Sequence, residues 1–357
     1  MSAWYYAPPV TARSGVADYA HRLWPALAAL GDSRVNLYHL GNNPLHDAIY
    51  TRALAEPGAV VLHDAVLHHF LLGRLSRDEY IAEFVHNYGE WKRLLAQDLW
   101  NARAGSGIDP RYFEFPMVRR IAEVSRAVIV HNPGAAEIVR AHGAARLHVI
   151  PHFFEGQSPG AADAARFRER LHIPQTAVLF GIFGYLRETK RIAASLTAFR
   201  RLRAQDSNAH LLIAGQPVSA DLARMLDATA DDEGIHRLGH LTDEELNTSA
   251  AAIDCCINLR YPAAGESSGI AMRMMGVGKP VILTRGLETS ALPEHTWLGV
   301  THGVGEVEEL FLQMALVAQM PAVGRDTGEA ARRHIAEHHS LATIARQYRD
   351  VLLSAGA

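Results

Sequence analysis

The chain has 357 residues, of which 48% are hydrophobic and 20% are charged, and its formal net charge is −3. This composition is that of a globular protein with room for two domains of ordinary size. Because the net charge is close to zero, we expect no nucleic-acid partner. No apolar run reaches the ~18 residues that a membrane-spanning helix needs, so we expect no transmembrane segment.

The cysteines and the first residues bear on the cellular compartment. Cys255 and Cys256 are adjacent within an apolar run, which predicts buried free thiols in a reducing environment. The start of the chain has neither the basic nor the apolar segment of a secretory leader. We therefore expect a cytoplasmic protein, and peripheral contact with the inner face of a membrane stays open. The histidines show no metal-ligand spacing, so we predict no metal site.

The first part of the chain alternates apolar runs with amphipathic segments. We expect strands at residues 35–40, 59–62, 127–130 and 147–150. Helical patterns lie at residues 16–30, 78–104, 112–125 and 134–142. The alternation predicts buried parallel strands with helices on both faces of a sheet. The segment 78–104 carries Trp91 and Trp100, and we interpret it as core in preference to an acceptor wall or a membrane-facing surface.

The same alternation restarts after a segment rich in Gly, Pro, Ser and Ala. Strands are expected at residues 178–183, 210–214, 235–238, 255–259 and 281–283, and helices at 191–204, 220–229, 242–251 and 340–353. The predicted domains are 1–152, completed by the C-terminal helix 340–357, and 163–339, with 153–162 as the linker. The expected fold class is α/β, with two Rossmann-like doubly wound domains facing a cleft. In such sheets ligands sit outside the carboxyl ends of the strands.

Residues 265–284 contain a Gly278-Lys279 pair that imitates a phosphate loop. Pro280 and a strand follow this pair instead of a helix, so the interpretation as a phosphate loop fails, and we expect Lys279 to point to solvent. The opposite end of the segment is the start of a helix, whose unpaired amides attract anions.

At that helix start the residues are small, except for one carboxylate. The amides of Ser267, Ser268 and Gly269 would face phosphate or sugar, and Glu266 would accept hydrogen bonds from hydroxyl groups. The alternative is an ordinary helix cap by Ser267 or Ser268. A carboxylate beside anion-binding amides suits a sugar nucleotide.

Polar residues also lie at strand ends and helix starts of the first domain. Gly15 lies at a predicted helix start, where a backbone could approach a diphosphate, and the alternative is a plain turn. His63 follows a predicted strand and could polarise a sugar hydroxyl, while a structural histidine is the alternative. His131, Asn132 and His152 follow later strands, and we interpret each of them as structural.

In the second domain, residues 184–190 connect a strand to a helix. Arg187 and Lys190 are two cations near a helix start, which suits a diphosphate clamp beside Gly184 and Tyr185. The alternative is a solvated charge pair with Glu188. After the strand 235–238 comes a turn, Gly239 and His240, that could cover a nucleobase. Together with the helix-start amides, these residues make up the predicted cofactor-binding set: Gly15, Gly184, Tyr185, Gly239, His240, Ser267, Ser268 and Gly269.

In chain order, these segments resemble the retaining glycosyltransferases of family 4, which have the GT-B fold and use nucleotide sugars. The resemblance to this family rests on the segments SGVADYAHRLWPALAALG, VIVHNPGAAEIV, HVIPHFF, GYLRETKRIAASLTAFRRL, HLLIAGQP and GESSGIAMRMMGVGKPVI. The resemblance implies that Glu266 faces the hydroxyls of the donor sugar and that Lys190 binds its diphosphate. It also places His63 in the region that supplies a histidine to the reaction.

The sequence departs from the family pattern at two positions. The second glutamate of the E-x7-E motif, which holds the ribose, is replaced by Met274, and the arginine after the glycine of the phosphate segment is replaced by Tyr185. Arg187 could supply the missing charge.

The resemblance implies hexosyl transfer, with retention of configuration, from a nucleoside-diphosphate sugar (UDP, GDP or another) to a hydroxyl acceptor. The acceptor could be a glycan, a lipid-linked saccharide or a small molecule. The predicted catalytic set is His63, Glu266, Lys190 and Arg187, with no cofactor and no metal. No D-x-D motif occurs, which fits a design that relies on cations and amides. The alternatives are a GT-B nucleotide-sugar epimerase and a non-catalytic protein that binds sugar nucleotides. A Rossmann dehydrogenase is disfavoured because no G-x-G-x-x-G is present.

Overall fold

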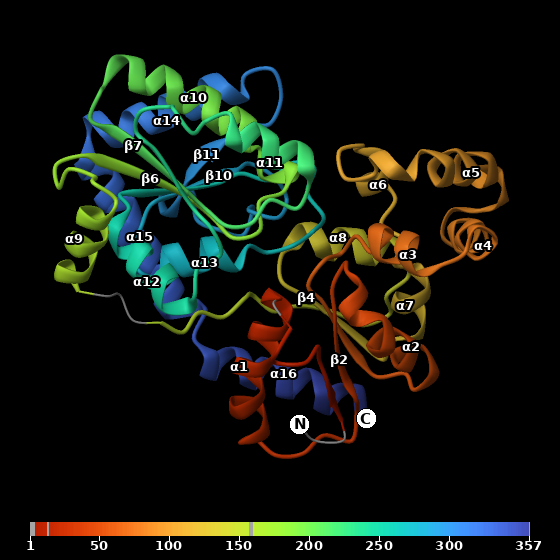
Figure 1. Cartoon of the computed structure of the whole chain (residues 1–357). Coiled ribbons are helices and arrows are strands. Elements are labelled where there is room, and N and C mark those ends of the chain that lie inside the picture. Colours follow the sequence, from red (N-terminus) through yellow and green to blue (C-terminus); the bar gives the residue numbers. More distant parts are fainter. Residues whose placement is uncertain (1–3, 13, 157–159, 357) are drawn as a thin grey trace. The chain divides into compact units, whose positions relative to one another are not determined.

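The computed structural model describes residues 4–12, 14–156 and 160–356. The chain divides into two compact units. Unit 1 comprises Met1–Phe153, Pro262–Ser267 and Leu341–Ala357, and unit 2 comprises Phe154–Tyr261 and Ser268–Ser340. Within the linker predicted at 153–162, residues 157–159 lie outside the described part of the chain. The expected α/β class is confirmed, since each unit is built on a parallel sheet covered by helices (Figure 1).

The unit 1 sheet has five parallel strands in the order β1-β2-β3-β4-β5. They are β1 (Tyr5–Tyr6), β2 (Leu37–Leu40), β3 (Ala59–Leu62), β4 (Ala127–Val130) and β5 (Leu147–Val149). Strands β2, β3 and β4 are buried along their whole length, because helices cover both faces of the sheet. The expected strands at 35–40 and 147–150 are shorter than predicted. Strand β5 is only half-buried, because it lies at the edge of the sheet.

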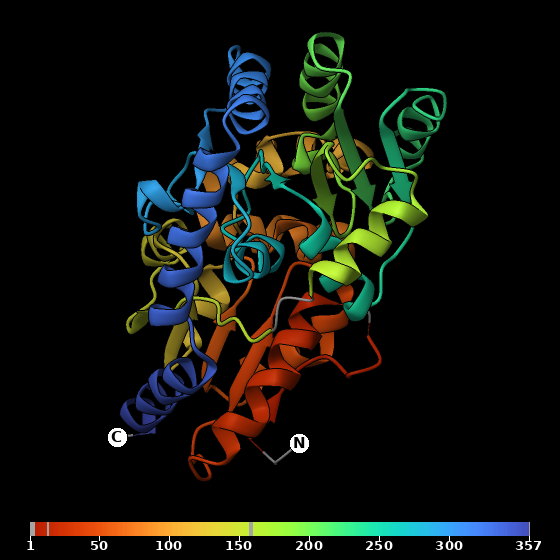
Figure 2. The same cartoon turned by 90° about the vertical axis from the view of Figure 1, so that its left-hand side faces the viewer.

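Helices pack on both faces of the unit 1 sheet. Helices α1 and α16 lie side by side on one face (Figure 1 and Figure 2), where the Tyr19 and Tyr348 hydroxyls are 3.1 Å apart. Residues of α2, α7 and α8 share the core on the other face with residues of α3–α6. The helices are α1 (Gly15–Ala28), α2 (Asp47–Ala55), α3 (His68–Arg74), α4 (Arg77–Tyr88), α5 (Arg93–Ala102), α6 (Arg111–Glu114), α7 (Arg119–Val124), α8 (Pro133–Ala141) and α16 (Leu341–Gly356), with short 3-10 turns η1 (Pro44–His46), η2 (Glu90–Lys92) and η3 (Arg103–Gly105).

Two helices predicted for unit 1 are broken in the structure. The segment 78–104 is split into α4 and α5 at Gly89, whose φ of +89° is a conformation that favours glycine. The segment 112–125 is split into α6 and α7 around Pro116, which cannot continue a helix. The interpretation of 78–104 as core is wrong for Trp91, which is 79% exposed, whereas Trp100 packs partly buried against the core.

The unit 2 sheet has six parallel strands in the order β11-β10-β9-β6-β7-β8. They are β6 (Val178–Phe183), β7 (Ala209–Ala214), β8 (Ile235–Leu238), β9 (Cys255–Asn258), β10 (Val281–Thr284) and β11 (Leu298–Val300). The chain runs from β6 outward to β8, then returns to the other side of β6 as β9. Such a reversal is the switch point at which open α/β sheets bind their ligands. A ligand site is therefore expected at the carboxyl ends of β6 and β9.

Helices also cover both faces of the unit 2 sheet. One face packs α10, α11 and α14, and the other packs α9, α12, α13 and α15. Their bounds are α9 (Ala161–Arg170), α10 (Ile192–Gln205), α11 (Ala220–Asp227), α12 (Asp243–Ala252), α13 (Gly269–Gly276), α14 (Glu306–Gln319) and α15 (Pro321–His338), with 3-10 turns η4 (Glu188–Lys190) and η5 (Glu294–Thr296). Within the described ranges, each helix is too short or too polar to cross a membrane.

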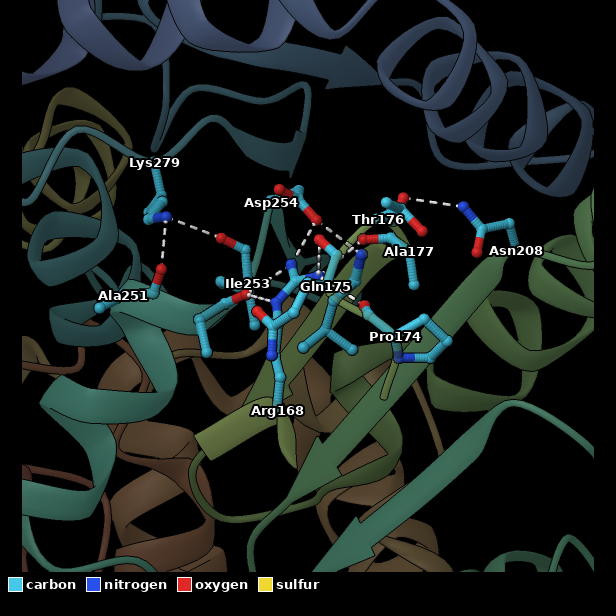
Figure 3. Close-up of polar contacts among 12 residues, drawn as sticks. Arg168, Pro174, Gln175, Thr176, Ala177, Asn208, Ala251, Ile253, Asp254 and Lys279 are labelled. Atoms are coloured by element: carbon cyan, nitrogen blue, oxygen red, sulfur yellow. Dashed lines mark hydrogen bonds and ion pairs between the residues drawn. The ribbon is translucent and has the colours of Figure 1, made fainter. Parts of the chain in front are cut away.

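Lys279 does not point to solvent, so that expectation is wrong. Its Nζ donates to the main-chain carbonyls of Ala251 and Ile253, each at 2.8 Å, at the C-terminal end of α12 (Figure 3). A helix C-terminus has unpaired carbonyls and a partial negative charge, which a lysine satisfies. Burial lowers the pKa of Lys279. The lysine that imitates a phosphate loop is therefore a helix cap at the amino edge of the sheet.

Arg168 occupies the same edge of unit 2 and is 6% exposed. Its guanidinium donates to the carbonyl oxygens of Ala252 (2.7 Å) and Ala177 (2.7 Å) and to the Asp254 carboxylate (2.8 Å). The same Asp254 oxygen accepts from the Leu179 amide at 2.8 Å. Figure 3 shows the bonds of Arg168 converging on its guanidinium. Arg168 thus joins α9 to the starts of β6 and β9.

Candidate functional site

The switch point of unit 2 brings three elements together. The loop after β6 begins at Gly184, whose φ is +87°. A methyl group added at Gly184 would lie 3.1 Å from Lys190 Nζ and 3.6 Å from the side chain of Ile270, in the first turn of α13. The β6 loop, the η4 lysine and the start of α13 therefore meet at one place, within a few ångströms. A ligand bound there would contact both a cation and helix-end amides.

Lys190 is held inside this arrangement. It is 8% exposed, and its ammonium donates to the Phe183 carbonyl at the last residue of β6. The ammonium also lies near enough to Cys256 to oppose the rise in pKa that burial gives this thiol. Tyr185 and Arg187 are exposed on the same loop. The predicted pair of cations thus consists of one buried, fixed lysine and one exposed arginine.

The amino end of α13 has the cap that the sequence offered as an alternative. Ser268 Oγ accepts from the Ala271 amide at 3.2 Å, so Ser268 is the N-cap. The same oxygen accepts from Asn258 Nδ2 at 3.0 Å and from Arg260 Nη2 at 3.3 Å. Asn258 is 6% exposed, and its Oδ1 has no hydrogen-bond partner among the described residues. Sequence reasoning missed Asn258, although it is the last residue of β9 and so lies at the switch point.

Glu266 lies in the segment Pro262–Ser267, which belongs to unit 1. Its carboxylate is half-buried and Oε2 accepts from the Ala264 amide at 2.8 Å. The Ala264 carbonyl in turn accepts from the amides of Ala65 (2.9 Å) and Val66 (3.1 Å), in the loop that follows β3. Gly265 has φ +72°, and a methyl group there would lie 2.6 Å from the Ala65 methyl group. The backbone around Glu266 is therefore packed closely against the loop that follows β3.

Asn132 also holds this segment. Its Nδ2 donates to the Gly265 carbonyl at 2.9 Å and to Ser267 Oγ at 3.1 Å, one residue on either side of Glu266. Its Oδ1 accepts from the Ala135 amide at 2.8 Å, which makes Asn132 the N-cap of α8, with Pro133 at the first helical position. The sequence predicted a structural role for Asn132 but not its link to the segment of Glu266. Its only sequence signal is its position just after β4.

The remaining predicted binding residues lie at helix and strand ends. Gly15 is the first residue of α1 and is exposed, and no atom of the described residues lies within 4 Å of the position of an added methyl group. Gly239 and His240 follow β8 and are exposed. Strand β8 is separated from β6 by β7, so this turn is two strands away from Lys190.

His63 is part of a buried chain of three imidazoles in unit 1. His131 Nδ1 lies 2.9 Å from the Ile150 carbonyl, His131 Nε2 lies 3.2 Å from His63 Nδ1, and His63 Nε2 lies 3.0 Å from His39 Nδ1. A carbonyl only accepts, so His131 Nδ1 carries a proton. If all three rings are neutral, His131 Nε2 accepts a hydrogen bond from His63 Nδ1, and His63 Nε2 accepts one from His39 Nδ1. His63 and His39 therefore also carry their proton on Nδ1. His39 Nε2 is then a buried acceptor without a partner in the described residues.

Burial keeps these three rings neutral. It lowers the pKa of His131 to about 4 and the pKa values of His39 and His63 well below their ordinary range, and neighbouring histidines lower the latter two further. Both nitrogens of His63 are engaged inside unit 1. For His63 to donate a hydrogen bond to a ligand, it would have to give up His39 or His131. A structural role, which the sequence offered as the alternative, fits this geometry.

Three further expectations concern cysteines, Met274 and metal. Cys255 and Cys256 are buried free thiols, as predicted. Met274 is fully buried in the core of unit 2, so its side chain is turned away from solvent. Its neighbour Arg273 donates to Asp243 Oδ1 at 3.2 Å. In the part of the chain that the structure describes, no three His, Cys, Asp or Glu side chains are grouped so that they could hold a metal ion.

The chain is similar to known proteins in part of its sequence and in its fold. Residues 177–336 match the family model described as Glycosyl transferases group 1. HepE from Anabaena in complex with UDP-glucose is 16% identical, with 98% of each chain covered and a TM-score of 0.66. Sucrose-phosphate synthase from Thermosynechococcus elongatus is 19% identical over 89% of this chain and 74% of that chain, with a TM-score of 0.63. No curated protein matches the sequence.

WaaG, a glycosyltransferase involved in lipopolysaccharide biosynthesis, is 14% identical, with 98% of each chain covered and a TM-score of 0.63. The expected resemblance to GT-B glycosyltransferases and the expected GT-B fold are confirmed. The match at residues 177–336 supports a glycosyl-transfer function. Assignment to family 4 stays a prediction.

Proposed function

We propose that this chain, whose residues 177–336 match the group 1 glycosyl transferases, moves a hexosyl group from a nucleoside-diphosphate sugar to a hydroxyl acceptor. We propose retention of configuration and a family 4 type of reaction. UDP-sugars are the first donors to test, because HepE is a structural neighbour in complex with UDP-glucose. The acceptor is a glycan, a lipid-linked saccharide or a small molecule with a free hydroxyl.

The observation that supports this proposal best is the convergence at the switch point of unit 2. Lys190 Nζ, the glycine loop after β6 and the first turn of α13 meet there, in the segment that matches the family. A helix start and a fixed ammonium form a suitable site for a diphosphate. Gly184 matters because any side chain at that position would crowd Lys190.

The chemistry requires that negative charge be stabilised as it builds up on the departing diphosphate. As the anomeric bond breaks, the bond's electron pair goes to the diphosphate oxygen, and the sugar acquires oxocarbenium character. The acceptor oxygen bonds to the anomeric carbon, and its proton passes to the departing diphosphate. A preorganised ammonium and peptide dipoles stabilise that charge without reorganisation. In the proposal Lys190 and the α13 amides do this, Arg187 adds charge from the exposed side of the loop, and the main-chain amide of Gly15 supplies a further donor. Glu266 accepts hydrogen bonds from sugar hydroxyls.

A ligand-binding experiment tests the proposal. UDP-glucose, GDP-mannose and ADP-glucose are each added to the protein, and the shift in Tm is measured, because a ligand that binds only the folded state stabilises it by mass action. At a ligand concentration of 100 Kd the stabilisation is about 2.7 kcal/mol. We expect one nucleotide sugar to raise the Tm by several degrees, and Lys190→Ala to abolish most of that shift.

The matched control is Lys92→Ala, at a half-exposed lysine on η2 of unit 1. It should leave the ligand-induced shift unchanged. If none of the three sugar nucleotides stabilises the wild type, donor binding is refuted for those bases. If a nucleotide sugar binds and is converted to an isomeric nucleotide sugar without any acceptor, the alternative of an epimerase is correct. If it binds and no acceptor hydroxyl is ever glycosylated, the non-catalytic binding protein is correct.

A further inference from the structure

We infer that Asn132 is a positioning residue for Glu266, and this inference rests on the function proposed above. Asn132 uses its one amide group for two tasks. The oxygen caps α8, and the nitrogen fixes the residues on both sides of Glu266. The residue is 3% exposed, so these bonds are made away from water.

The argument begins with the backbone of the segment Pro262–Ser267. Three of its oxygens are held by unit 1: the Ala264 carbonyl by two amides after β3, and the Gly265 carbonyl and Ser267 Oγ by Asn132. The Glu266 carboxylate is then oriented from within the segment, by the Ala264 amide at 2.8 Å. Loss of the Asn132 amide nitrogen removes two of these anchors at once. The carboxylate would keep its local bond but would lose the fixed backbone beneath it.

The size of the effect follows from the role of Glu266. A carboxylate that must meet sugar hydroxyls as the anomeric bond breaks is sensitive to small displacements, and a misplacement of about 1 Å can cost roughly a hundredfold in rate. Loss of hydrogen bonds to a loop should cost much less in overall stability, because each one contributes about 1 kcal/mol net. Asn132 should therefore affect turnover more than it affects folding.

Asn132→Ser separates the two tasks. Serine is as good an N-cap as asparagine, so α8 keeps its cap, but the short hydroxyl cannot replace the amide nitrogen at Gly265 and Ser267. Asn132→Ala removes both tasks. The matched control is Asn87→Ser in α4, another asparagine that is 3% exposed, whose side-chain nitrogen bonds to the Glu83 side chain and carbonyl and not to the segment that carries Glu266.

Two measurements are made on the full chain. The first is hydrogen–deuterium exchange of the peptide that covers residues 262–268. We expect Asn132→Ser to speed its exchange at least tenfold, while Asn87→Ser leaves it unchanged at a similar Tm. Equal exchange in Asn132→Ser and in the wild type would overturn the inference, whatever the enzyme does.

The second measurement is the release of UDP from UDP-glucose, analysed as a double-mutant cycle with Glu266→Gln. If Asn132 acts through Glu266, Asn132→Ser lowers kcat about ten- to a hundredfold, with little change in KM, in the wild-type background. It should have almost no effect when Glu266 is already Gln. Multiplicative effects of the two changes would refute the inference. A wild type that turns over no sugar nucleotide would instead refute the proposed function, and the exchange experiment would still decide the role of Asn132.

Discussion

At the scale of single residues, Lys279 shows how a familiar spacing can serve a different purpose. The chain has three lysines, and the one in the Gly-Lys pair caps α12 through the carbonyls of Ala251 and Ile253. Removing it leaves both carbonyls without this donor. Its role is therefore in stability and lies at the opposite edge of the sheet from Lys190.

We expect Lys279→Met to lower the free energy of unfolding of unit 2 by about 1–3 kcal/mol, because unsatisfied polar groups are costly. The measurement is calorimetric Tm, with Lys92→Met as the matched control. Binding of the sugar nucleotide that stabilises the wild type should be unaffected by Lys279→Met. A variant that keeps its stability but loses ligand binding would show that Lys279 belongs to the site after all.

Some local features of the candidate site follow from the sequence and others do not, while the roles of its residues stay predictions. Lys190 and Ser268 could be predicted because each follows a strand at a helix start, and that pattern is local. The partners of Lys279 could not, because they lie 28 and 26 residues away in the chain and only the packed sheet brings them close. The bonds of Asn132 were missed for the same reason, since the Gly265 carbonyl that it holds is 133 residues away.

At the scale of elements, three neighbouring strands of unit 1 carry the imidazole chain. His39 lies within β2, His63 follows β3 and His131 follows β4, so parallel neighbours bring the rings into line. All three pKa values are lowered, chiefly by burial. Folding therefore favours the neutral rings, and the pH dependence of stability follows from that.

We expect the free energy of unfolding to fall as the pH drops below about 6.5. In that range the histidines bind protons in the unfolded state, whereas the buried rings of the folded state stay neutral. The contribution of His131 should be fully present above about pH 6.5 and lost as the pH falls toward about 4. A pKa that is lower by 1 in the folded state than in the unfolded state corresponds to about 1.4 kcal/mol of stability. The measurement is urea unfolding between pH 7 and 5.

The control for this pH dependence is His39→Leu, which removes one of the three rings. Its unfolding free energy should vary less steeply with pH than that of the wild type, since one fewer proton is taken up on unfolding. Buried histidines elsewhere, such as His46 and His68, should supply the dependence that remains. An unchanged slope would show that the chain of imidazoles titrates normally in the folded state.

The sequence predicts the buried strands better than it predicts the unbroken length of the helices. Apolar strands such as 59–62 and 127–130 match the structure, because a fully buried parallel strand leaves a strong local pattern. The helix expected at 78–104 is broken at Gly89, and the periodicity of its side chains does not reveal the break. The positive φ of Gly89 depends on how α4 and η2 pack, and that is not a local property.

At the scale of the whole molecule, unit 1 contains both ends of the described chain as well as the internal segment Pro262–Ser267. Helix α16 buries Ile344 and Tyr348 completely against the sheet and α1, and the Tyr348 hydroxyl meets Tyr19. Unit 2 has its own core clusters, and among the described residues these contain none from α16. Removal of α16 should therefore damage only one of the two units.

We expect truncation after Ser340 to strip amide protection from β2, β3 and β4 while β6 and β7 keep theirs. Hydrogen exchange measured peptide by peptide distinguishes the units, since local opening follows local packing. Tyr348→Phe is the control: it removes only the hydroxyl contact with Tyr19 and should have a small effect. Loss of protection in both units after truncation would show that unit 2 depends on α16.

The place of α16 has a consequence for how the protein is made. A ribosome releases the chain from its N-terminus, so every residue of unit 2 leaves the tunnel before Leu341–Gly356 does. During synthesis unit 2 can fold before unit 1 is complete. Until α16 has been made, unit 1 exposes the apolar face of its sheet on which this helix packs. We therefore expect chaperones to shield the apolar sheet face of nascent chains on which α16 later packs beside α1.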